Sequence, residues 1–142
     1  MTKLLAQVLF CDDIRREVGG KISLIGVLRN GITLERNPPV RLPKLAVIPI
    51  LSIIGPTAGT TVEIVGRVSW SDSEEPTFTA TFIVHESDVD GLSEDGQLQV
   101  IGDIVMPGFP ARDNGELIVT ARLNDEPEIP IGALEFTFQQ PD

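Results

Sequence analysis

The chain has 142 residues, of which 42% are hydrophobic and 23% charged, and its formal net charge is −10. This length is close to the usual size of one domain, and the apolar content is enough for a core without cross-links, so we expect a single domain over residues 1–142. The acidic balance argues against nucleic-acid binding, which needs clustered Lys and Arg to replace the counterions on phosphates.

The beginning of the chain and its single cysteine indicate where the protein works. One cysteine, Cys11, excludes an internal disulfide and a zinc site built from several cysteines. The first apolar run is broken by Gln7 and ends at Asp12 and Asp13, so we interpret it as a strand and not as an export signal. The longest apolar block, from Leu45, is about half the length of a membrane-spanning helix. We therefore expect a cytoplasmic protein without membrane contact.

Charge is distributed unevenly along the chain. Residues 1–44 hold eight Lys or Arg against four Asp or Glu, whereas residues 45–142 hold three against seventeen. One interpretation is a solvated surface that keeps the protein soluble. The other is that the basic and acidic parts steer protein partners, or copies of the same chain, toward each other. We therefore expect a protein partner or self-association.

The charged corner at residues 11–20 follows the first apolar run. Five charged residues lie there within six positions, namely Asp12, Asp13, Arg15, Arg16 and Glu17. Ile14 and Val18 have the spacing of one helical turn, which an aspartate would cap and Gly19 would end. This structural interpretation competes with a functional one, in which the five residues bind a partner and the arginines recognise carboxylates or phosphates.

Alternation of apolar and polar residues with period two predicts strands along the rest of the chain. In residues 60–70, for example, Val62 and Ile64 alternate with Glu63. We expect eight strands, at residues 3–10, 21–28, 44–54, 60–70, 77–85, 97–105, 116–123 and 131–138, with a short extra piece near 32–34. Pro49 lacks a ladder donor, which predicts an edge strand or a bulge there. The pattern predicts an all-β, two-layer antiparallel sandwich.

The sequence offers little for catalysis. Its single histidine, His85, ends an alternating strand on the polar side, where we expect it to face solvent. Cys11 ends an apolar strand, where a buried, inert thiol is expected. No glycine-rich phosphate loop is present, and the phenylalanines alternate in the manner of core residues. We therefore expect no enzyme activity, no catalytic residue and no cofactor.

An acidic segment at residues 86–97 raises a calcium alternative. Glu86, Asp88 and Asp90 alternate, Gly91 follows, and Glu94 stands at the ninth position, in the manner of a calcium loop. However, the first position lacks the shorter Asp and the twelfth is a glutamine, which has no bidentate carboxylate. We expect no metal site. The alternative function is a calcium-dependent ligand-binding β-sandwich domain that uses this loop.

Two segments carry a resemblance to a known family. CDDIRREVGGKISLIGVL at residues 11–28, followed by PPVRLPKLAV at 38–47, resembles small bacterial proteins grouped as a domain of unknown function, and IGALEFTF at 131–138 resembles their last strand. The resemblance implies an immunoglobulin-like β-sandwich of about eight strands. It implies no activity, and any shared role would fall on the matching positions, which are Asp12, Asp13, Arg15, Glu17, Gly19, Gly20 and Lys21. We accordingly expect a non-catalytic binding or assembly module.

Overall fold

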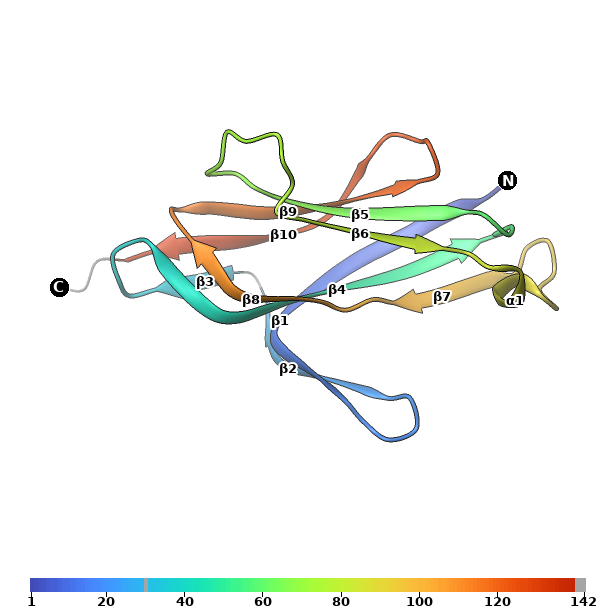
Figure 1. The fold of residues 1–142 in the computed structure, drawn as a ribbon, viewed down its shortest axis with the longest axis horizontal. Helices are drawn as coiled ribbons and strands as arrows, with labels where there is room; N and C mark the ends of the chain where they lie inside the picture. Colours follow the sequence, from blue (N-terminus) through green and yellow to red (C-terminus); the bar gives the residue numbers. More distant parts are fainter. Residues whose placement is uncertain (30, 140–142) are drawn as a thin grey trace.

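Figure 1 shows the fold in a computed structural model, which describes residues 1–29 and 31–139. The described residues form ten strands and one short helix. In chain order they are β1 (Lys3–Arg16), β2 (Ile22–Leu28), β3 (Gly31–Leu34), β4 (Val40–Ile54), β5 (Thr61–Val68), β6 (Phe78–Ile83), α1 (Glu86–Val89), β7 (Gln97–Ile101), β8 (Ile104–Ala111), β9 (Gly115–Leu123) and β10 (Ile129–Phe138). No helix among them is long and apolar enough to cross a membrane.

The strands form two sheets that face each other across one core (Figure 1). Sheet A has the order β2-β1-β4-β7, and β8 also pairs with β4. Sheet B has the order β3-β10-β9-β5-β6. All pairs are antiparallel except that of β3 with β10, which is parallel. The predicted all-β, two-layer sandwich is confirmed, and the short piece expected near residues 32–34 is β3.

The core follows from the alternation seen in the sequence. Val62 and Ile64 of β5 are buried, as are Leu117 and Val119 of β9, and both pairs pack in one cluster with Leu51 of β4. In a strand, residues two apart point to the same face, so each sheet contributes one face to this cluster. Burying these side chains is the main favourable contribution to folding.

The structure corrects the prediction made for Pro49. Strand β4 runs through the middle of sheet A, with β1 on one side and β7 and β8 on the other, so it is not an edge strand. The ladder instead stops between the pairs Ile50–Ile101 and Val47–Ile104, where Pro49 has no N–H to donate. The single strand expected at residues 97–105 is therefore two strands, separated at Gly102 and Asp103.

Candidate functional site

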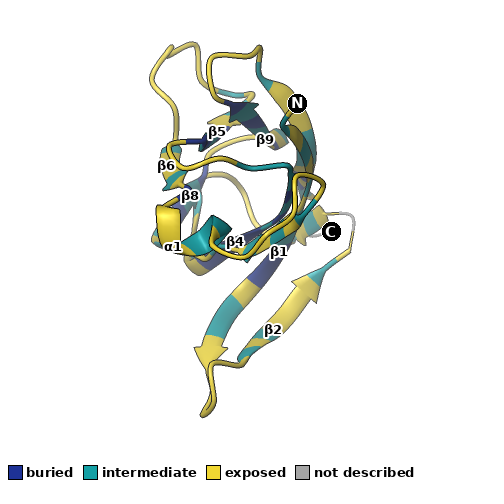
Figure 2. Ribbon diagram, turned by 90° about the vertical axis from the view of Figure 1, so that its right-hand side faces the viewer, coloured by how far each residue is buried: buried dark blue, intermediate teal, exposed yellow. Residues whose placement is uncertain are grey.

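The charged corner lies in a β-hairpin that projects from the sandwich (Figures 1 and 2). Strand β1 pairs with β4 only from Lys3 to Cys11, and beyond that point it pairs with β2 alone. We call residues 12–26 of this hairpin the arm. Most of the arm is exposed (Figure 2). The predicted strand at 3–10 thus continues to Arg16.

The prediction of a helical turn at residues 14–18 is wrong. The chain there is extended up to Arg16, and it reverses through a tight turn in which the Glu17 N–H donates to the Lys21 carbonyl at 2.8 Å. Gly19 and Gly20 have φ angles of +82° and +75°. Glycine adopts this left-handed conformation without steric cost, so the Gly-Gly pair forms a hairpin turn and does not end a helix.

The arm bends back over the outer face of sheet A. Cys11 is buried on that face with Ala46 and Ile48, and Ile14 and Leu24 of the arm pack against the same cluster. Cys11 and Ile14 are three residues apart, so strict alternation would place them on opposite faces. The alternation therefore breaks between these two residues, and the arm turns one side toward the body of the protein.

Two of the five predicted site residues hold the arm in place. Arg16 forms an ion pair with Asp103, which lies between β7 and β8, and Lys44 of β4 donates to the Asp13 carboxylate at 3.4 Å. The other carboxylate oxygen of Asp13 accepts the Ile14 N–H at 2.9 Å. This backbone hydrogen bond, together with Lys44, lowers the pKa of Asp13. Asp13 and Arg16 are thus engaged within the chain.

The other three predicted residues are exposed, and Arg15 is placed differently from Arg16. Arg15 pairs with Ser23 in the ladder, whereas Arg16 pairs with Ile22, so their side chains point to opposite sides of the arm. Arg16 reaches the body, whereas Arg15 lies on the other side of the arm, together with Asp13 and Ile25. Among the described residues, Arg15 has no ion-pair partner. Asp12 and Glu17 are also exposed.

Sequence reasoning missed the apolar residues of the arm. Val18 at the tip is 95% exposed, and Ile25, which pairs with Asp13, is also exposed. Exposed large apolar residues continue onto the outer face of sheet A, where Leu5 is 61% and Ile101 58% exposed. A signal was available in the sequence, because ISLIGVL is an uncharged strand next to a turn, and protected edge strands usually carry charge or proline.

The acidic segment at 86–97 does not form a calcium loop. Residues Glu86–Val89 form the single turn α1, and the Asp88 carboxylate accepts the backbone N–H of His85 at 2.8 Å. Across residues 1–29 and 31–139, no group of three His, Cys, Asp or Glu side chains is placed to hold a metal ion. In this geometry the acidic side chains of the segment do not form the set of ligands that the calcium-dependent alternative requires.

His85 and Cys11 lie as the sequence predicts. His85 is exposed and precedes α1, and Cys11 is fully buried. Burial raises the pKa of the Cys11 thiol, and the thiol donates a hydrogen bond to the Asp13 carbonyl at 3.3 Å. A buried thiol with a raised pKa is a poor nucleophile.

Comparisons with known proteins do not assign the chain to a family. Neither a scan against protein-family models nor a search of curated proteins gives a match to the chain. The class of protein is therefore defined by the structure alone, as a two-layer β-sandwich from which a hairpin arm projects.

Proposed function

We propose that the protein is a non-catalytic binding or assembly module, and that its arm contacts a partner protein. The observation that carries this proposal is the outward side and tip of the arm, where an arginine without an ion-pair partner among the described residues stands beside exposed apolar side chains. Exposed apolar side chains of this kind, next to charged ones, are typical of protein-binding surfaces.

The side chains of the arm indicate which chemical groups the partner surface carries. Arg15 and Lys21 supply two positive charges near the tip, and Val18 supplies an apolar contact between them. Arginine binds carboxylates through two parallel hydrogen bonds. We therefore propose a partner surface that carries carboxylates around an apolar patch. A cytoplasmic location, expected from the sequence, and a bacterial source, implied by the resemblance, are part of this proposal.

The arm is also suited to this role mechanically. Its body-facing side is fixed by Ile14 and Leu24 and by the ion pair of Arg16 with Asp103, so the outward side has a defined orientation. A preformed surface loses less conformational entropy on binding than a free loop does. Asp13 and Arg16 would then act as positioning residues, and Arg15, Val18 and Ile25 as contacts.

A double variant of the tip tests the proposal. Arg15→Glu with Val18→Asp changes charge and polarity on exposed side chains only, so we expect the melting temperature to stay within a few degrees of wild type. Arg36→Glu, on the exposed loop between β3 and β4, is the matched charge control. The measurements are the mass of the pure protein by light scattering and quantitative cross-linking in the native host.

We expect the cross-linked species formed by wild type and by Arg36→Glu to be lost in the double variant. If self-association is the role, the mass in solution falls in the double variant as well. Equal cross-linking by all three proteins would overturn the proposal. A large fall in melting temperature for the double variant would mean that these side chains stabilise the fold, and that the charged cluster has a structural role.

A further inference from the structure

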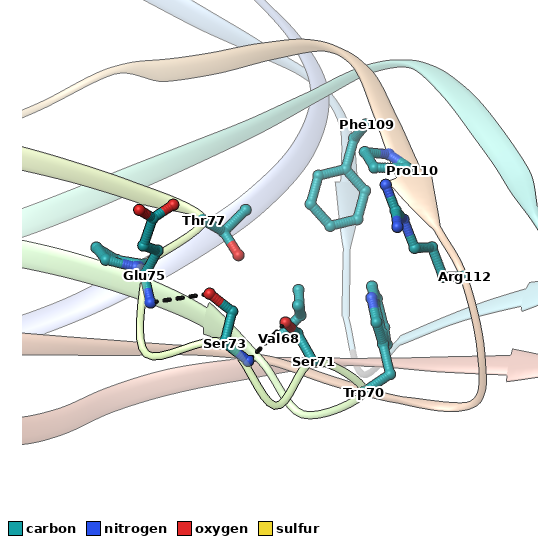
Figure 3. Close-up of a pocket in the computed structure, with 10 residues that line it drawn as sticks. Val68, Trp70, Ser71, Ser73, Glu75, Thr77, Phe109, Pro110 and Arg112 are labelled. Atoms are coloured by element: carbon teal, nitrogen blue, oxygen red, sulfur yellow. Dashed lines mark hydrogen bonds between the residues drawn. The ribbon is translucent and has the colours of Figure 1, made fainter.

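A cavity of about 330 Å³ opens at one end of the sandwich, far along the chain from the arm (Figure 3). It is lined by residues at and just beyond the ends of β5 and β8 and by the loop over residues 71–77. Cavities of this size are at the lower end of the range that holds small organic ligands.

The floor of the cavity is aromatic. Trp70 packs edge-on against Phe109 and Phe136, with ring centroids 6.3 Å and 5.4 Å away. Phe109 and Phe136 are themselves stacked and buried. The three rings hold one another in fixed orientations, so the part of Trp70 that lines the cavity is a rigid apolar surface.

One positively charged side chain lies beside this aromatic floor. The Arg112 side chain lines the cavity, and Figure 3 shows its guanidinium next to the rings of Trp70 and Phe109. Within the described part of the chain, this guanidinium has no ion-pair partner. The only carboxylate among the lining residues, that of Glu75, lies on the opposite side of the cavity in Figure 3.

Polar groups line the side opposite Arg112. The hydroxyl oxygens of Ser71 and Ser73 accept backbone N–H groups of their own loop, at 3.2 Å and 3.1 Å. These two bonds shape the loop, and the hydroxyl hydrogens remain available to a ligand. The site therefore combines an apolar ring surface, a guanidinium with several N–H donors at one side and hydroxyl groups at the other.

We propose that this cavity binds an organic carboxylate with a flat apolar body, with its ring against Trp70 and its carboxylate on Arg112. A guanidinium matches the planar geometry of a carboxylate and binds it through two parallel hydrogen bonds. The carboxylate belongs either to a small acid or to the C-terminus of a peptide. The proposal is independent of the arm.

The chain provides its own reporter for this site. It has one tryptophan and no tyrosine, so its intrinsic fluorescence reports on Trp70 alone. The probes are 3-phenylpropionate and its neutral amide, which have the same shape and differ in charge. A short peptide with a C-terminal phenylalanine, with a free or an amidated end, distinguishes the two sources of the carboxylate.

We expect a saturable fluorescence change with 3-phenylpropionate in the millimolar range, and binding of the amide weaker by about tenfold, which corresponds to one charge-assisted hydrogen bond. Arg112→Gln should remove this difference, and Arg36→Gln, a surface control, should keep it. Tighter binding of the free-ended peptide than of the small acid would identify a chain end as the ligand. The absence of saturable change with every probe, or equal binding of acid and amide, would overturn the proposal.

Discussion

Asp12 and Gly26 face each other at the base of the arm, and Gly26 has a φ angle of +69°. A Cβ atom on Gly26 would lie 2.2 Å from the Asp12 carboxylate. This position lies within the segment where the alternation of β1 breaks, because Cys11 and Ile14 share one side of the chain there. The bend of the arm therefore depends on a residue that tolerates the left-handed conformation and needs no space for a side chain.

Gly26→Ala should destabilise the protein by about 1 kcal/mol, the usual cost of a left-handed conformation for a residue with a Cβ atom. The Asp12 side chain is exposed and can move aside. Adding Asp12→Ala should therefore recover only a small part of the loss. Urea unfolding measures both variants. If Gly26→Ala were as stable as wild type or more stable, the bend would not depend on this conformation, since a glycine-to-alanine change at a compatible site stabilises.

The fold was largely predictable because alternation determines which face each strand buries. The strands at 116–123 and 131–138 were predicted within two residues of β9 and β10. The long range from Gln97 was misread as one strand because the break between β7 and β8 is set by Pro49, on a neighbouring strand far away in the sequence. Local patterns contain no information on such a partner.

The site was predictable only in part for a similar reason. The charges at Asp13 and Arg16 were visible in the sequence, but their partners Lys44 and Asp103 are distant in the chain. Sequence spacing could not separate these tethering residues from Arg15, which is free to meet a partner. The aromatic cavity was not predicted at all, since Trp70, Phe109 and Arg112 come together only when the two sheets pack.

Cys11 should be unreactive in the folded protein. Its side chain is fully buried and its thiol pKa is raised by burial, so little thiolate is present and reagents have no access to it. Labelling with a thiol reagent near neutral pH should be very slow in buffer and complete in denaturant. Because Cys11 lies beneath Ile14 and Leu24, fast labelling of the native protein would show that the arm opens from the body.

Calcium should not change the stability of the protein. Asp88 is engaged with the backbone of His85, and the acidic side chains of the segment do not converge. A ligand that binds only the folded state raises the melting temperature. Because we expect no calcium to bind, millimolar calcium should give the same melting curve as a chelator. A rise of several degrees with calcium, absent with magnesium, would revive the calcium-dependent alternative.

Because of Glu128, the stability of sheet B should depend on pH in the acid range. Its carboxylate accepts hydrogen bonds from Arg67 at 3.1 Å, Thr120 at 3.1 Å and Arg122 at 3.4 Å. Burial acts to raise the pKa of Glu128, but the hydrogen bonds with Arg67 and Thr120 and the charges of both arginines outweigh it, and the pKa is lowered. The stabilisation is thus present above the ordinary glutamate pKa of about 4.3 and is lost as the pH falls through the lower, folded-state value.

Glu128→Gln should therefore lower the free energy of unfolding by about 1 kcal/mol at neutral pH, in line with partly exposed ion-pair networks. The difference from wild type should shrink as the pH falls below the folded-state pKa, because the wild-type carboxyl is then neutral too. Urea unfolding at a series of pH values measures this, with Glu116→Gln, an exposed glutamate of the same sheet, as the control. A difference that stays constant across the acid range would mean that Glu128 stabilises sheet B by packing and not by its charge.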